Sequence, residues 1–261
     1  MTTSRTAQTP RVAPTTAEVE HRPLPQLVGL HVVPGVITAA LFYATAPLAI
    51  RAGFPAIGAG MLAAAVAVVG FELGWLLYQA RRRSGHWSLR SVLPYRPTRF
   101  GWRKALLVLG LLLWAVAAAI VVGGLKPVVV DNLFGWMPAW AINPLPEDIG
   151  DTASDTVLLI TAIGLLLVNV LAGPLVEELY FRGYLLPRLS RLGAWAPLVN
   201  ISLFSLYHLW KPWDLLALIV ILTPMAYAVW YTRDIRVGIA VHVGLNGMGY
   251  LTSSLPTLLA G

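Results

Sequence analysis

Residues 105–125 read ALLVLGLLLWAVAAAIVVGGL and contain no charged side chain. An α-helix needs about 20 predominantly apolar residues to cross the hydrocarbon core of a bilayer, so this run is long enough to span a membrane. The other apolar runs cover 26–50, 54–80, 194–210, 213–231 and 237–259, and one more begins at 156 and becomes amphipathic toward 191. The sequence therefore predicts an all-α fold, a polytopic transmembrane helical bundle of about seven spans.

The composition of the whole chain agrees with a membrane protein. The 261 residues are 57% hydrophobic and only 12% charged, with a mean hydropathy of +0.70, whereas soluble domains carry about 25% charged residues. The sequence has no cysteine, which excludes disulfides, thiolate metal sites and cysteine nucleophiles. Its net charge of +7 resides in short connections between apolar runs, so we expect the lipid bilayer as a partner and no nucleic acid.

The distribution of charge predicts how the chain is organised and oriented. Residues 1–25 are rich in Thr, Ala, Pro and Arg and lack the apolar core of a signal peptide, which predicts a disordered tail. Basic residues gather at 81–104, 188–191 and 233–236, whereas the connection 126–155 is acidic. Because Lys and Arg favour cytoplasmic loops, we expect a cytoplasmic N-terminus, an external 126–155 segment and a multi-pass protein of the plasma membrane. Residues 26–125 would form the N-terminal transmembrane helices.

Few ionisable side chains lie inside the apolar runs. Each costs at least ~2.5 kcal/mol at the centre of a bilayer, so each is a candidate for function. The stretch around Glu177, Glu178 and Arg182 is the densest. Glu178 and Arg182 are spaced i, i+4 and can pair along one helical face, while Glu177 points about 100° away. We therefore expect Glu178 and Arg182 to orient the site and Glu177 to act on a ligand.

Three further polar side chains occupy the later runs, namely His208, His242 and Asn246. Counted from the expected cytoplasmic ends, Glu177 and His208 both lie roughly 20 Å along their helices, and His242 lies at a shallower depth. A carboxylate beside a histidine can deprotonate a water, and a second histidine with an asparagine can stabilise an oxyanion. Glu177, His208 and His242 could instead bind zinc, with an open position for water.

Two polar side chains of the first two runs have less certain roles. A lone histidine in a membrane span usually makes an interhelical hydrogen bond, and this is the role we favour for His31. Glu72 could support the site, or it could pair with an arginine of the basic connection. The sequence contains no H-E-x-x-H zinc motif and no serine-protease G-x-S-G turn, which argues against two other classes of intramembrane protease.

Taken in order, these residues resemble the CPBP family, which comprises CAAX proteases and bacteriocin-processing or self-immunity proteins and is also called Abi. Its motifs E-E-x-x-x-R, F-x-x-x-H and H-x-x-x-N are matched by Glu177, Glu178, Arg182, Phe204, His208, His242 and Asn246. The resemblance covers roughly 155–250. It implies that 155–259 is a CPBP-like catalytic transmembrane core and that the protein is an intramembrane endopeptidase.

The family resemblance also implies residue roles. Glu177 and His208 would activate the water, and His242 and Asn246 would stabilise the oxyanion. Glu178, Arg182 and Phe204 would have supporting roles. Members of the family are described both as metalloproteases and as metal-free, glutamate-dependent enzymes, so a divalent metal such as zinc stays open. The substrate would be a peptide or protein, either prenylated or a bacteriocin or signal-peptide remnant.

Two functions of other classes use the same residues. A non-enzymatic immunity or peptide-binding protein would hold a peptide in the same cavity without cleaving it. A proton-coupled transporter would use the glutamate and histidines as a proton relay, although the sequence shows no internal repeat of the kind that many transporters carry.

Overall fold

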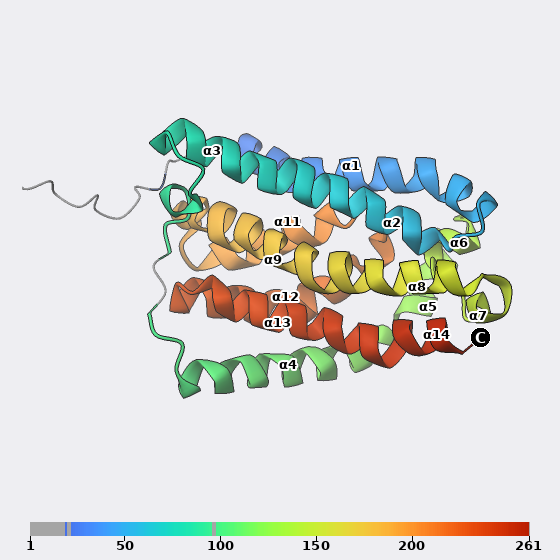
Figure 1. The fold of residues 1–261 in the computed structure, drawn as a ribbon. Coiled ribbons are helices and arrows are strands. Elements are labelled where there is room, and N and C mark those ends of the chain that lie inside the picture. The colour runs from blue at the N-terminus through green and yellow to red at the C-terminus, as the bar shows by residue number, and fades with distance from the viewer. Residues whose placement is uncertain (1–18, 20–21, 96–97, 261) are drawn as a thin grey trace, which may run out of the picture.

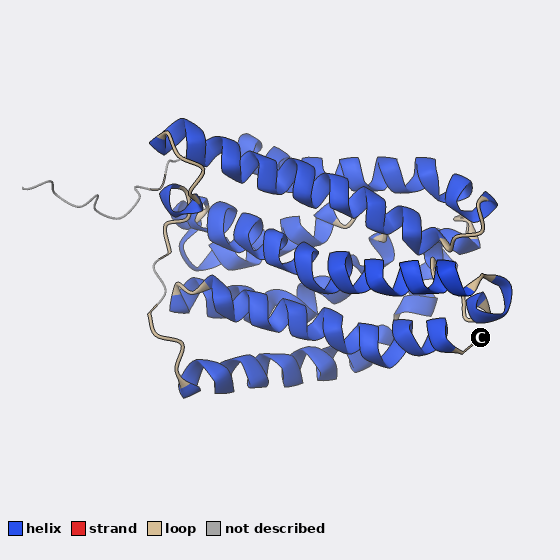
Figure 2. Cartoon of the chain, viewed as in Figure 1, coloured by secondary structure: helices blue, strands red, loops and turns tan. Residues whose placement is uncertain are grey.

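The computed structural model describes residue 19 and residues 22–95 and 98–260. Most of the predicted N-terminal tail, 1–25, therefore lies outside the described residues. The described part is a helical bundle without strands (Figure 2). The predicted all-α membrane bundle is confirmed.

The first half of the chain forms three long helical rods. Pro55, in an extended conformation, caps the start of the second rod. Gly85 ends this rod in a left-handed conformation (φ 73°), which glycine adopts without strain. The helices are α1 (Leu24–Arg51), α2 (Ala56–Ala64), a π-helical stretch (Ala65–Leu73), α3 (Gly74–Ser84) and α4 (Trp102–Gly123). Short helices follow at α5 (Lys126–Val129), α6 (Ala139–Ile142) and α7 (Ile149–Thr152).

The second half begins with one continuous rod from 155 to 188 and ends with three shorter segments. The rod comprises α8 (Asp155–Gly164), a π-helical stretch (Leu165–Ala172), α9 (Gly173–Glu177), a second π-helical stretch (Glu178–Leu185) and α10 (Leu186–Arg188). The later helices are a 3₁₀ turn (Ser190–Trp195), α11 (Ala196–Tyr207), a 3₁₀ turn (Pro212–Asp214), α12 (Leu215–Thr232), α13 (Ile235–Gly249), a π-helical stretch (Tyr250–Ser254) and α14 (Leu255–Leu259).

The two ends of the bundle carry different charges. The end of α3, the start of α4 and the α12–α13 turn lie together at one end, while α5, α6, α7 and the C-terminus lie at the other (Figure 1). We call the first the basic end, because it carries the arginines and lysines of 81–95, 98–104, 188–191 and 233–236. The second is the acidic end, formed by 124–154 with Asp131, Glu147, Asp148 and Asp151.

Five helical rods are long and apolar enough to cross a membrane, namely Leu24–Arg51, Ala56–Ser84, Trp102–Gly123, Asp155–Arg188 and Pro212–Thr232. The other two predicted spans, 194–210 and 237–259, do not meet this measure. Helix α11 has 12 residues, which is about 18 Å and shorter than the hydrocarbon core. The count of seven spans therefore stays a prediction, as does the division into 26–125 and 155–259.

A buried aromatic cluster fixes α1, the 155–188 rod and α11 against one another. Tyr180, Phe181, Tyr184, Phe204 and Tyr207 are all fully buried. The Phe181 ring lies 4.9 Å from Phe204 and 5.1 Å from Tyr207 between centroids. The Tyr180 hydroxyl donates to the Leu30 carbonyl of α1 at 2.8 Å. These rings place the polar side chains of the rod and of α11 at a common depth.

Candidate active site

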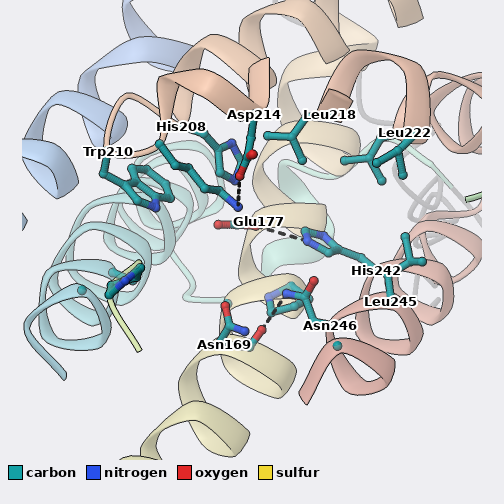
Figure 3. Close-up of a pocket in the computed structure, with 18 of the residues that line it drawn as sticks. Asn169, Glu177, His208, Trp210, Asp214, Leu218, Leu222, His242, Leu245 and Asn246 are labelled. Atoms are coloured by element: carbon teal, nitrogen blue, oxygen red, sulfur yellow. Dashed lines mark hydrogen bonds and ion pairs between the residues drawn. The ribbon is translucent and has the colours of Figure 1, made fainter. Parts of the chain in front are cut away.

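The four residues predicted as catalytic converge on one cavity. Glu177, His208, His242 and Asn246 all line a cavity of about 810 Å³ in the interior of the bundle. Figure 3 shows Glu177 between His208 of one segment and His242 of another, with Asn246 one turn further along α13. Most of the other lining residues are apolar, so these side chains are gathered in a largely hydrophobic space.

The Glu177 carboxylate is held from two sides. It is the last residue of α9 and is 8% exposed. The Tyr207 hydroxyl donates to its Oε1 at 3.1 Å, and Nε2 of His242 lies 3.7 Å from its Oε2. A buried carboxylate needs such partners to remain charged in a hydrophobic interior. Glu177 also lines the cavity, where a ligand can reach its carboxylate.

The neighbouring Glu178 lies behind the cavity wall. It forms an ion pair with Arg182 at 3.3 Å, and both side chains are fully buried. Its Oε1 also accepts from Nδ1 of His242 at 3.1 Å. Neither Glu178 nor Arg182 lines the cavity. Adjacent glutamates of one rod thus face different surroundings, and Glu178 determines which nitrogen of His242 is presented to Glu177.

His208 follows the last residue of α11 and turns its ring into the cavity. Its Nδ1 lies 2.9 Å from the carbonyl oxygen of Phe204, which acts as the acceptor, so Nε2 is left with a lone pair directed at a ligand. Phe204 separates the histidines from Arg182. Its ring lies 4.8 Å from the His208 ring, 6.1 Å from the His242 ring and 4.1 Å below the Arg182 guanidinium.

Asn246 lies one helical turn beyond His242. Its Nδ2 donates to the backbone carbonyl of Asn169 at 2.7 Å. Asn169 belongs to the π-helical stretch before α9, where backbone carbonyls are available to side chains. A primary amide has two N–H groups, so Asn246 keeps a second donor for a ligand.

The comparison with known families rests on this part of the chain. Residues 159–248 match the model of the family described as type II CAAX prenyl endopeptidase Rce1-like. This match supports a CAAX protease family for the segment that carries the site. All seven motif residues expected from the sequence fall within the matched segment. No curated protein and no solved structure matches this chain.

The donors that the described residues bring together do not form the zinc site that the sequence allowed. Among the residues that the structure describes, no three His, Cys, Asp or Glu side chains come together as a metal site would require. Nδ1 of His242 is engaged with Glu178 at 3.1 Å. We therefore derive no chemical step through a metal.

Helix α1 contacts the segment that carries the site through His31, which lies outside the cavity. Its ring accepts from Asn200 of α11, with Nδ2 and Nε2 3.1 Å apart, and its Nδ1 donates to the Leu27 carbonyl at 2.7 Å. Asn200 Nδ2 also donates to the Phe181 carbonyl at 3.1 Å. His31 is thus the interhelical hydrogen bonder that we expected.

Glu72 lies beside the site, in the second rod. It is fully buried, and neither of its carboxylate oxygens has a hydrogen-bond partner among the described residues. It interacts electrostatically with Glu177 and Arg182 and faces the Tyr207 hydroxyl. Of its two predicted roles, this position corresponds to support of the site. The sequence did not single out Tyr207, although its place directly before His208 was a usable signal.

Proposed function

We propose that this protein hydrolyses a peptide bond with a water that Glu177 and His208 activate. The observation that carries the proposal is the position of Glu177 in the cavity, between a hydroxyl donor and a histidine. A substrate carbonyl in this cavity would be within reach of a carboxylate, two imidazoles and an amide at once. Such a set is what hydrolysis by a bound water needs.

The reaction begins with proton transfer from water to the Glu177 carboxylate. His208 orients this water through the Nε2 lone pair, because its Nδ1 proton is committed to the Phe204 carbonyl. The hydroxide adds to the carbonyl carbon and forms a tetrahedral oxyanion. Glu177 then gives its proton to the leaving amine as the C–N bond breaks, which restores the carboxylate and releases a carboxylic acid and an amine.

The oxyanion is stabilised by His242 and Asn246. To donate from Nε2 while Nδ1 donates to Glu178, His242 must be an imidazolium. Carboxylates lie at both of its nitrogens, Glu178 at 3.1 Å from Nδ1 and Glu177 at 3.7 Å from Nε2. Donors fixed in advance toward the developing charge typically contribute about 10²–10³-fold in rate.

The test is cleavage by purified protein in detergent and in liposomes. The probes are a fluorogenic apolar peptide and its prenylated counterpart. Comparing the two cleavage rates tests whether the family's prenylated substrate class applies here. Glu177→Ala and His208→Ala should each abolish cleavage while the thermal unfolding midpoint is kept. Glu147→Gln, an exposed acid of the acidic end, is the matched control and should keep full activity. Retained cleavage in both Glu177→Ala and His208→Ala would overturn the mechanism.

A further inference from the structure

The cavity extends from Glu177 toward one end of the bundle only. In α2 it is lined by residues 57–64, in α4 by 115–120, in α12 by 218–222 and in α13 by 242–249. These residues belong to α2 and to the halves of α4, α12 and α13 that lie nearer to the acidic end (Figure 1). None of the lining residues comes from the described parts of 85–104, 188–195 or 233–236, which form the basic end.

The shortness of α11 explains this direction. The helix begins at the basic end and stops at Tyr207, about 18 Å along its axis. The chain then turns through 208–214 and returns as α12. No helix of this pair fills the space between the turn and the acidic end, and the cavity occupies it. Trp210, Lys211 and Trp213 of the turn belong to its lining.

Charged side chains of the lining mark the mouth. Lys126 of α5 is exposed. Lys211 and Asp214 are partly exposed and lie 3.9 Å apart. All three belong to α5 or to the 208–214 turn, which contact each other near the acidic end. Water therefore reaches the cavity from that end, past these side chains.

The opposite route, from Glu177 to the basic end, is filled. Phe181, Arg182 and Leu185 continue the rod beyond Glu177 and are fully buried. Val237 of α13 is also fully buried at this level. A peptide segment could pass here only if these packed side chains moved apart.

Resting on the proposed function, we infer that the substrate enters this cavity from the outer face of the membrane. Lysines and arginines in short connections remain in the cytoplasm, so the basic end faces the cytoplasm and the mouth faces outward. The walls are apolar, with Met61, Val68, Ile120 and Leu222 among them. The substrate class is accordingly an apolar peptide segment presented at the outer face, such as that of an exported or membrane-anchored peptide.

The absence of cysteine in this chain allows a direct test with single-cysteine variants. Ala119→Cys places a thiol in the cavity wall. Ala117→Cys lies two residues away, nearly opposite on α4, is exposed and does not line the cavity. Arg99→Cys reports the basic end, where residue 99 is exposed. Each variant is treated with a charged, membrane-impermeant thiol reagent, in right-side-out and in inverted vesicles.

We expect Ala119→Cys to react from outside at least about tenfold faster than Ala117→Cys, because only the former thiol is reached by water. Arg99→Cys should react only in inverted vesicles. The modified Ala119→Cys protein should lose cleavage of the apolar peptide, whereas the modified Arg99→Cys protein should keep it. Reaction of Ala119→Cys only in inverted vesicles, or in neither preparation, overturns the inferred route.

The labelling does not depend on activity, so the two proposals can fail separately. If no variant cleaves any peptide, the proposed function fails while the labelling pattern still reports the side on which the cavity opens. If cleavage is normal and modification at Arg99→Cys abolishes it, the proposed function stands and the outward route is wrong.

Discussion

At the scale of single residues, the adjacent glutamates show how surroundings divide the roles of identical side chains. Glu178 is fully buried between Arg182 and His242, at 3.3 and 3.1 Å. Glu177 meets a neutral hydroxyl and the cavity. One carboxylate balances buried charge, and the other is available to a ligand. Substitution of Glu177 should therefore lower the rate of cleavage, whereas substitution of Glu178 should lower the stability of the fold.

Glu177→Gln keeps the shape and the Tyr207 contact but removes the proton acceptor. We expect kcat for peptide cleavage to fall by about 10²–10⁴-fold, with an unchanged thermal unfolding midpoint. Glu178→Gln leaves the buried Arg182 without its partner, which should cost about 3–5 kcal/mol of stability. Activity assays and thermal unfolding in detergent measure both variants. Equal loss of stability in the two would show that the glutamates do not differ in role.

Glu72→Gln should separate stability from activity. The substitution removes a fully buried ionisable carboxyl group whose oxygens have no hydrogen-bond partner among the described residues, so the unfolding midpoint should rise. Glu72 also interacts with Glu177 and faces the Tyr207 hydroxyl that donates to it, so the substitution should disturb the position of Glu177. We expect kcat to fall about tenfold, or ~1.4 kcal/mol in the barrier. A variant that is less stable and fully active would contradict this role.

The sequence predicted much of the site because polar residues are rare in apolar runs. Glu177, His208 and His242 stood out for that reason, and all three line one cavity. Depth counting placed His242 too shallow, yet its Nε2 lies 3.7 Å from Glu177. Tyr207 was missed because a tyrosine in a membrane protein is usually interfacial. Only the packing of α11 on the rod reveals its contact with Glu177.

At the scale of elements, hydropathy predicted where helices lie but not how long each one is. The apolar run 194–210 indicated a span, whereas α11 ends at Tyr207. Hydropathy continues through Leu209 and Trp210, so the sequence gives no sign of the break before the 208–214 turn. The break is what leaves space for the cavity. A site in a membrane protein depends on such early helix ends.

The approach of α1 to α11 depends on Gly35. A Cβ at this position would overlap the backbone carbonyl of Tyr207, whereas a Cβ at Gly29 on the same helix meets open space. Gly35→Ala should push α1 away from α11 and cost about 1–3 kcal/mol. It should also lower activity, because Tyr207 donates to Glu177. Gly29→Ala is the matched control and should be neutral or slightly stabilising, since alanine favours helix. Thermal unfolding and cleavage assays of the pair decide the point.

At the scale of the whole molecule, one cluster of charges joins two helices at the basic end. Asp234 caps the start of α13 and accepts from the Arg236 backbone amide at 3.1 Å. Its Oδ2 lies 2.6 Å from Nζ of Lys104 on α4 and 2.8 Å from Arg236. The cluster fixes α4 against α13, and the far halves of both helices contribute to the cavity wall. The basic end is thereby held closed while the acidic end stays open.

The same cluster predicts how stability depends on pH. Burial alone would raise the pKa of the Asp234 carboxyl, but the hydrogen bonds from Arg236 and Lys104 outweigh burial and lower its pKa from 3.8 to about 2. The folded state therefore holds the charged form more strongly than the unfolded state does. The contribution is complete above pH 3.8 and is lost as the pH falls through 2. Because Arg236 is 42% exposed and screened by solvent, we expect about 1–2 kcal/mol.

Asp234→Asn should remove this contribution at neutral pH and with it the corresponding part of the acid dependence. Thermal unfolding in detergent is measured at about pH 6, 4 and 2.5, which extends from above the ordinary pKa of 3.8 to near the folded-state pKa of about 2. The quantity compared is the unfolding midpoint of wild type and variant. The difference should be largest at pH 6 and should shrink toward pH 2.5. Asp148→Asn, at an exposed position of the acidic end, should follow the wild type throughout. A difference that stays constant with pH would mean that Asp234 stabilises the α4–α13 contact by its shape rather than by its charge.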